Sequence, residues 1–184
     1  MGMDRTGLHI FPNDPDGPRP DGFVRALHLR RVLPIAESCT IADGELTATS
    51  LEIYEDGTIL RYFVIANDEI VREHAERNAE MQRLISENDR TAIRRFAETH
   101  FTRIPGRNVY MRLEDDFGTT YHGLLRGGEG GDRRFESNYG FTPATPPEAQ
   151  RLRILLFEGD WQRDTGEATR RDPEHLVRAF EVSL

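Results

Sequence analysis

Alternating apolar and polar residues predict a β-hairpin in residues 47–65. Leu51 and Ile53 share one parity of the first strand, whereas residues 58–65 are apolar on both parities, as expected for a strand inside a sheet. Glu55-Asp56-Gly57 separates the two runs. An Asp-Gly pair between β-rich runs is typical of a tight primed turn, so we expect Gly57 to adopt a positive φ.

A similar alternation precedes the hairpin. Phe23, Leu27, Leu29 and Leu33 share one parity and predict a strand that Pro34 ends. Residues 1–21 mix proline with aspartate and glycine, a composition that sustains neither a helix nor a strand ladder. We therefore expect a flexible arm at 1–21 and a folded domain at 22–184.

The period changes in residues 67–101, which contain no proline or glycine and are rich in Glu, Arg and Ala. Asn67 or Asp68 can cap a first helix, and Asn88 or Asp89 can cap a second. Apolar stripes run along both predicted helices, through Ile70, Met81, Leu84 and Ile85 in the first and Ile93, Phe96 and Ala97 in the second. Two helices joined by a short turn are predicted, as an insertion at 67–105.

Strand patterns resume after Pro105 and continue almost to the end of the chain. They fall at residues 109–113, 120–125, 135–141, 152–157 and 176–184. Turns are expected at residues 116–118 and at the glycine-rich residues 127–131. Seven or eight short strands without a βα rhythm predict a mainly β fold, a two-sheet antiparallel sandwich with an inserted two-helix segment.

The order of several residue groups resembles that of uncharacterised bacterial immunoglobulin-like domains. These groups are Asp115-Asp116-Phe117-Gly118-x-x-Tyr121, Phe141-x-Pro143, a leucine-rich strand and a final Phe180-x-Val182 strand. The resemblance implies an immunoglobulin-like antiparallel sandwich with the helical pair inserted after its third strand. It brings no catalytic residues with it, and the chain lacks the paired cysteines of antibody domains.

Composition narrows the classes of function. All 24 basic residues are arginine, which excludes Schiff-base and phosphate-loop lysines, although a GC-rich genome would by itself produce the same bias. The net charge of −8 argues against nucleic acid or an anionic membrane as a partner. With the single Cys39 and no secretory leader, we expect a cytoplasmic protein without a cofactor.

Metal and enzyme chemistry have weak candidates. His74 and His100 each fall on the apolar stripe of a predicted helix, so two imidazoles could meet in a metal site between the helices and the sheet. Their spacing matches no established metal motif, and core or groove histidines satisfied by hydrogen bonds are the favoured interpretation. Residues 127–132 fit one copy of a calcium repeat that needs tandem copies, so we expect a hairpin loop there.

The remaining candidates favour binding over catalysis. Trp161, two residues before Arg163, has the composition of an interaction hot spot, unless its ring folds back over the sandwich. We expect a non-enzymatic protein-interaction or assembly module, with a protein partner or self-association. The expected partner-binding residues are Trp161, Arg163, Ile70, Met81 and Phe96. Alternatives are a metal-binding protein or enzyme using His74 and His100, and a carbohydrate-binding sandwich using Trp161, Tyr121 and Tyr139.

Overall fold

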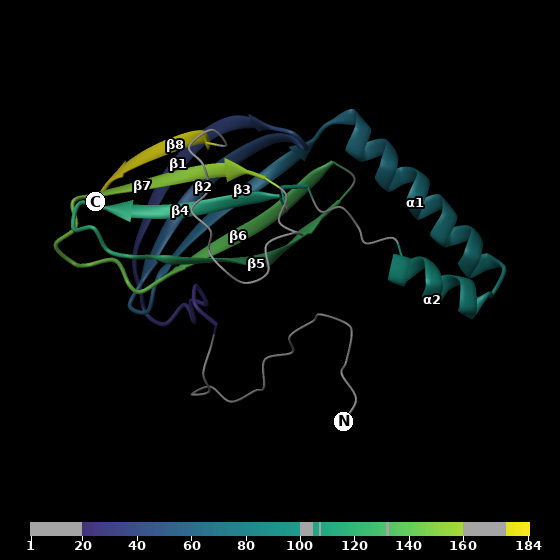
Figure 1. Ribbon diagram of the computed structural model, residues 1–184, viewed down its shortest axis with the longest axis horizontal. Coiled ribbons are helices and arrows are strands. Elements are labelled where there is room, and N and C mark those ends of the chain that lie inside the picture. The colour runs from purple at the N-terminus through teal and green to yellow at the C-terminus, as the bar shows by residue number, and fades with distance from the viewer. Residues whose placement is uncertain (1–19, 100–104, 107, 132, 160–175) are drawn as a thin grey trace, which may run out of the picture.

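The chain folds into two packed antiparallel β-sheets with a helical hairpin at one end (Figure 1). The computed structural model describes residues 20–99, 105, 106, 108–131, 133–159 and 176–184. In these residues the elements, in chain order, are β1 (Leu29–Ile41), β2 (Gly44–Tyr54), β3 (Thr58–Ala66), α1 (Asp68–Ser86), α2 (Arg90–Thr99), β4 (Val109–Asp115), β5 (His122–Gly130), β6 (Arg134–Thr142), β7 (Arg151–Glu158) and β8 (Leu176–Ser183). The predicted two-sheet architecture is confirmed.

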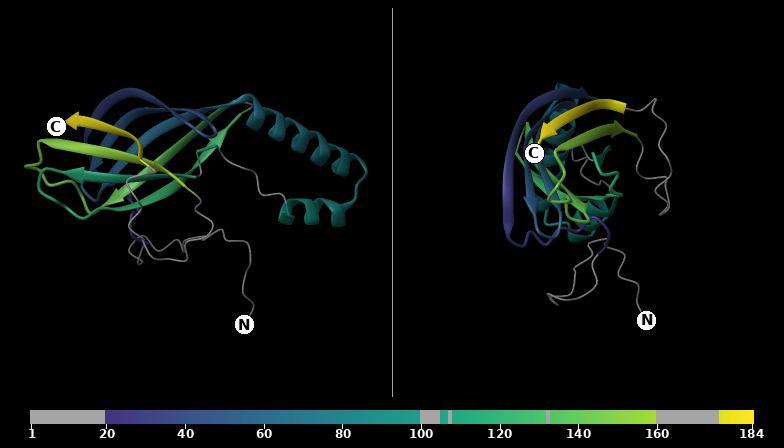
Figure 2. Two further views of the ribbon diagram at one scale, coloured as in Figure 1. Left: turned by 45° about the horizontal axis from the view of Figure 1, so that its top comes forward. Right: turned by 90° about the vertical axis from the view of Figure 1, so that its left-hand side faces the viewer.

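Five strands form the large sheet in the order β1-β2-β3-β6-β5, and three form the small sheet in the order β4-β7-β8. All neighbouring strands are antiparallel. Figure 2 shows the sheets face to face, with the core between them. Both sheets contribute side chains to this core, among them Leu46, Leu51, Leu60, Tyr139 and Phe141 from the large sheet and Met111, Leu113, Leu152, Ile154 and Phe180 from the small one.

The β2–β3 hairpin forms where the alternation predicts it, but its turn differs from the prediction. Gly57 does not adopt a positive φ, and the Tyr54 N–H donates to the Gly57 carbonyl oxygen at 2.8 Å. Glycine is required here for space, because a Cβ would lie 2.5 Å from the Phe141 carbonyl oxygen and 2.6 Å from a methyl of Val24. The chain at residue 24 therefore crosses directly over the turn.

The prediction for the first strand was wrong at both ends. β1 begins at Leu29 and continues through Pro34 to Ile41. Pro34 is tolerated because β1 is an edge strand of the large sheet, and the pairing with β2 shifts register between Pro34 and Glu37. Ala36 lies in this bulge with a φ of 56°. A proline in an edge strand costs no ladder hydrogen bond on the open side.

Residues 22–27, predicted as the start of that strand, instead form a strap across the end of the hairpin. The carboxylate of Asp56 accepts hydrogen bonds from the backbone N–H groups of Arg25 and Leu27, the latter at 3.2 Å. Val24 is fully buried between these bonds and the turn glycine. The N-terminal strap is thus fixed by one carboxylate and one apolar anchor.

The glycine-rich segment predicted as a turn lies largely within β5. Gly128 pairs with Ser137 and Gly130 with Phe135, after a bulge between Leu125 and Gly128. A Cβ on Gly128 would lie 2.2 Å from the Ser137 hydroxyl oxygen, and one on Gly130 would lie 2.3 Å from the Phe135 ring. The glycines therefore make room for β6, while the connection to β6 begins at Gly131.

Both helices form as predicted, with predicted caps. The Asn67 side chain accepts a hydrogen bond from the Ile70 N–H at 3.0 Å, and that of Asp89 accepts one from the Ala92 N–H at 2.9 Å. Figure 1 shows α1 extending away from the sandwich and α2 folding back along the far part of α1. The base of α1 is fixed by Ile70, which packs with Ala66 and Phe135. Neither described helix is long and apolar enough to cross a membrane.

Candidate functional site

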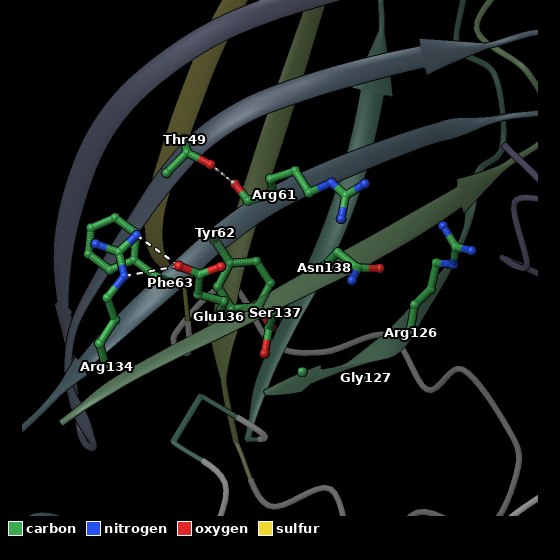
Figure 3. A pocket seen from close by; sticks show the side chains of 11 residues that line it. Thr49, Arg61, Tyr62, Phe63, Arg126, Gly127, Arg134, Glu136, Ser137 and Asn138 are labelled. Carbon is green, nitrogen blue, oxygen red and sulfur yellow. Dashed lines mark hydrogen bonds and ion pairs between the residues drawn. The ribbon is translucent and has the colours of Figure 1, made fainter. Parts of the chain in front are cut away.

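A polar pocket of about 390 Å³ lies on the outer face of the large sheet (Figure 3). Strand alternation creates it, because Leu60, Tyr62 and Val64 of β3 point into the core, which leaves Arg61 and Phe63 on the outer face. β6 contributes its own outward residues on the same principle. The lining comprises Thr49 from β2, Arg61, Tyr62 and Phe63 from β3, Arg126, Gly127 and Gly128 from β5, and Arg134, Glu136, Ser137 and Asn138 from β6.

At one end of the pocket lies Arg134, whose charge is already neutralised by a neighbouring carboxylate. The Arg134 guanidinium lies 3.9 Å from the centroid of the Phe63 ring, a cation–π distance. Its Nε also donates to a carboxylate oxygen of Glu136 at 3.1 Å. Arg134 therefore has both a stacking surface and a counter-ion, as the paired dashed lines of Figure 3 indicate.

Arg61 is held by a carboxylate from the neighbouring strand. Its Nε and Nη2 donate to the two oxygens of Glu52, each at 3.1 Å, and the Tyr54 hydroxyl donates to the same carboxylate at 2.8 Å. This bidentate bond raises the pKa of Arg61 above its ordinary value. Burial, followed by the bond to Glu52, raises the pKa of Tyr54. The geometry fixes the direction of the Arg61 guanidinium.

Arg126 is the unusual member of the pocket. Its side chain is partly buried, and its guanidinium lies 5.5 Å from the centroid of the Phe23 ring of the N-terminal strap. Burial, and after it the charge of Arg61, lowers the pKa of Arg126. Among the described residues, no carboxylate lies within ion-pair distance of it.

Asn138 lies between these two arginines. It is the direct cross-strand neighbour of Arg61, and Figure 3 shows its amide between the Arg61 and Arg126 side chains. Guanidinium and amide N–H groups are all donors, and arginine cannot serve as a base at physiological pH. This part of the pocket can therefore bind a group with acceptor oxygens.

The residues expected to bind a partner fall in different places. Ile70 is 1% exposed and packs inside the base of α1, so its side chain is not on the surface. Met81 and Phe96 are partly buried, one on each helix. Trp161 and Arg163 lie outside the described residues.

The two histidines of the metal hypothesis cannot be compared directly, because His100 also lies outside the described residues. His74 is partly buried, and its ring meets the edge of the Phe135 ring at a centroid distance of 5.2 Å. In the part of the chain that the structure describes, no three His, Cys, Asp or Glu side chains are grouped as metal ligands. His74 is observed to pack against β6.

The aromatic residues of the carbohydrate hypothesis are not gathered on a surface. Tyr139 is fully buried and stacks on Phe141 at a centroid distance of 5.2 Å, so it cannot present its face to a sugar. Tyr121 is partly buried and donates its hydroxyl hydrogen to Asp115 at 2.8 Å. Asp115 itself accepts the N–H groups of Phe117 and Thr119, which gives it a role in the turn.

Sequence analysis missed the arginine pocket because Arg61 and Arg126 are 65 positions apart in the chain. The pairing of β3, β6 and β5 brings them to the same face of the sheet. A signal for it was nevertheless present. Arg134, Glu136 and Asn138 occupy the polar parity of one strand, while Phe135, Ser137 and Tyr139 occupy the buried parity.

Comparison with known proteins finds a distant structural likeness. No family model matches the chain, and no curated protein matches it. The chain is similar to the crystal structure of a conserved domain protein from Bacillus anthracis, with 13% identity and a TM-score of 0.40. The similarity covers 88% of this chain and 49% of that one, so this chain spans about half of its length. At this distance the likeness informs neither fold type nor function.

Proposed function

We propose that the protein is a non-enzymatic interaction module built on an immunoglobulin-like sandwich. The strand order supports this type. Without the extra edge strand β1, the large sheet has the order β2-β3-β6-β5 and the small sheet β4-β7-β8. These orders correspond to strands A-B-E-D and C-F-G of the constant-type immunoglobulin fold. On this correspondence β1 is an addition beside strand A.

The same correspondence assigns the helical hairpin to the connection between strands B and C. In variable domains, the B–C and F–G connections at one end of the sandwich bind antigen. Here the end of β7 lies beside the end of the insertion, since the Gly159 N–H donates to the Asn108 carbonyl oxygen at 3.1 Å. The insertion end is therefore the surface that we assign to the partner.

The partner is a protein, which includes a second copy of this chain. Met81 and Phe96 are the described residues that we assign to this contact. We also assign Trp161 and Arg163, which lie two and four positions after Gly159 in the sequence. The net charge of −8 favours a protein over nucleic acid or an anionic membrane. The observation on which the proposal chiefly depends is the helical hairpin, because α1 extends away from the two sheets (Figure 2).

The test is removal of the insertion from the full chain. Replacing residues 68–104 by a short Gly/Ser linker leaves Asn67 and Gly106 in place, and both are bonded to Asp43. We expect circular dichroism to show that the variant keeps its two-sheet fold. If the partner is a second copy of the chain, light scattering should show that the assembly is lost. If the partner is another protein, cross-linking in the native host should no longer capture it.

The matched control is Arg153→Gln, on the outer face of the small sheet away from the insertion. It should retain both assembly and partner. If the deletion variant is folded and both properties are unchanged, the proposed function is wrong. Trp161→Ala then separates the two connections, because loss of partner binding with an intact hairpin would assign the contact to residues after β7.

A further inference from the structure

Of the three arginines that line the outer-face pocket, two are paired with a carboxylate. Glu52 pairs with Arg61 and Glu136 pairs with Arg134. The third arginine, Arg126, faces the same space without an acidic side chain within ion-pair distance in the described part of the chain. Arg126 is partly buried, and the charges of Asp56 and Glu52 act on it from beyond ion-pair distance, so its guanidinium keeps donors for a further acceptor.

The neighbours of Arg61 and Arg126 fix the place where an anion would bind. Arg61 is immobilised by its bidentate bond to Glu52 through Nε and Nη2, which leaves Nη1 outside that bond. Arg126 is placed from the other side, with the Phe23 ring beneath its guanidinium and the methylene of its Cδ 3.0 Å from the Cβ position of Gly140. An anion between the two would relieve their mutual repulsion and satisfy the remaining donors.

We infer that Arg126, Arg61 and Asn138 bind a single carboxylate of an acidic peptide segment. This site is distinct from the insertion end assigned above, and it requires no catalytic step. Asn138 lies on β6, the strand between those of the two arginines, where its amide N–H groups would donate to the same carboxylate (Figure 3). The pocket volume of about 390 Å³ exceeds what one side-chain carboxylate fills, so the neighbouring peptide is accommodated as well.

The charge balance favours a carboxylate over a phosphate. A carboxylate adds one negative charge to a surface that already holds Glu52 and Glu136, with Asp56 acting on Arg126, whereas a phosphate dianion would add two. Nucleic acid is disfavoured further by the net charge of the whole chain.

The shape of the pocket favours a peptide. Gly127 and Gly128 form its β5 border, and no side chain stands there to obstruct a second backbone. Gly127 has open space around its Cβ position. A chain passing this border would bring its own side chain over Asn138, on the strand between those of Arg61 and Arg126.

The test measures binding of three probes by NMR of the ¹⁵N-labelled full chain. The probes are the blocked tripeptide acetyl-Gly-Glu-Gly-amide, its Gln counterpart and inorganic phosphate. We expect the Glu peptide to shift the Asn138 amide and Arg126 Nε signals, and the Gln peptide and phosphate to bind at least about tenfold more weakly. Binding should weaken as salt is added.

Variants then assign the site. Arg126→Gln should weaken the Glu peptide by about tenfold or more, and Arg153→Gln, on the other sheet, should leave binding unchanged. Equal binding by Arg126→Gln overturns the inference, as does equal binding of the Gln peptide. Tighter binding of phosphate through Arg126 overturns the carboxylate assignment. None of these results depends on whether the helical insertion binds a partner.

A second variant tests the geometry by placing a carboxylate of the protein itself in the proposed anion site. Asn138→Asp places an acid beside Arg61 on the paired strand. We expect it to raise the melting temperature and to abolish binding of the Glu peptide. A lowered melting temperature together with unchanged peptide binding would show that the space between Arg61 and Arg126 is not an anion site.

Discussion

Asp43 bonds both ends of the helical insertion. Its carboxylate accepts a hydrogen bond from the Gly106 N–H at 3.0 Å, and its carbonyl oxygen accepts one from the Asn67 N–H at 2.9 Å. The residue is 2% exposed and lies in the β1–β2 turn. The insertion therefore leaves and re-enters the sandwich at one buried acid, which explains how a hairpin that projects so far has a fixed base.

The first prediction follows from this bond. Asp43→Ala removes the acceptor for a buried N–H group, and a hydrogen bond to a charged group contributes about 1.5–3 kcal/mol. We expect the free energy of unfolding to fall by about that amount, measured by urea denaturation, and the Gly106 amide to exchange faster with solvent. Asp116→Ala is the control, since Asp116 accepts the Gln150 N–H on the exposed surface and should cost less. Equal losses would contradict the assignment.

The second prediction separates two reasons for glycine. At Gly57 the obstacle to a side chain is steric, because a Cβ would lie 2.5 Å from the Phe141 carbonyl oxygen, whereas at Gly118 it is a φ of 73° in open space. We expect Gly57→Ala to lower the free energy of unfolding by about 2–4 kcal/mol and Gly118→Ala by about 1 kcal/mol. Thermal unfolding of both variants measures this, and a smaller loss at Gly57 would refute it.

The local patterns of the chain predicted the elements whose causes are local. The helices follow from the absence of proline and glycine and from the side-chain caps at Asn67 and Asp89, and the hairpin follows from alternation. The prediction that Pro34 ends the first strand was wrong because the effect of a proline depends on whether its strand lies at the edge of the sheet. The position of β1 in the sheet cannot be seen in the local sequence. The glycines of β5 misled for the same reason, since their small size is needed by β6 across the ladder.

The candidate pocket was beyond prediction for a related reason. Arg61 and Arg126 lie on the same face only because the large sheet has the strand order β3-β6-β5. Strand β5 pairs with β6, whereas β4, which precedes β5 in the chain, belongs to the other sheet. The polar parity of β6 could have indicated an outer face with Glu136 and Asn138 on it. It could not have indicated which strand supplies the second arginine.

The third prediction concerns pH. Burial alone would raise the pKa of Asp115, but hydrogen bonds from Thr119, Tyr121 and Phe117 outweigh it, and the pKa of Asp115 lies below its ordinary value. A group with a depressed folded-state pKa stabilises the fold above its unfolded pKa, about 3.9 for Asp, and that contribution is lost as pH falls through the folded value.

Tyr121→Phe removes one of those bonds, so the pKa of Asp115 should rise towards its ordinary value. We expect the variant to be less stable than the natural protein near neutral pH, with a smaller difference below the folded pKa of Asp115. A carboxyl-carbon NMR titration measures the pKa directly. Tyr110→Phe, near the opposite end of β4 from Asp115, is the control and should leave the pKa of Asp115 unchanged. An identical Asp115 titration in the Tyr121 variant would contradict the prediction.

The fourth prediction links the N-terminal strap to the pocket. Asp56 accepts the N–H groups of Arg25 and Leu27, and the strap that it fixes places the Phe23 ring beneath Arg126. Asp56→Ala removes both acceptors on a partly exposed surface, where each hydrogen bond to a carboxylate contributes about 1 kcal/mol. We expect a loss of about 1–2 kcal/mol in the free energy of unfolding, faster exchange at Arg25 and Leu27, and a changed Arg126 Nε signal.

The matched control is Asp21→Ala, because Asp21 is 82% exposed and, among the described residues, its ion-pair partner is His122 at 3.9 Å. It should change neither the exchange rates in the strap nor the Arg126 signal. Phe23→Leu then isolates the ring, since it keeps an apolar side chain but removes the π face under the guanidinium. A shifted Arg126 signal in this variant, with strap exchange unchanged, assigns the effect to the ring. If Asp56→Ala behaves as Asp21→Ala does, the strap does not position Arg126.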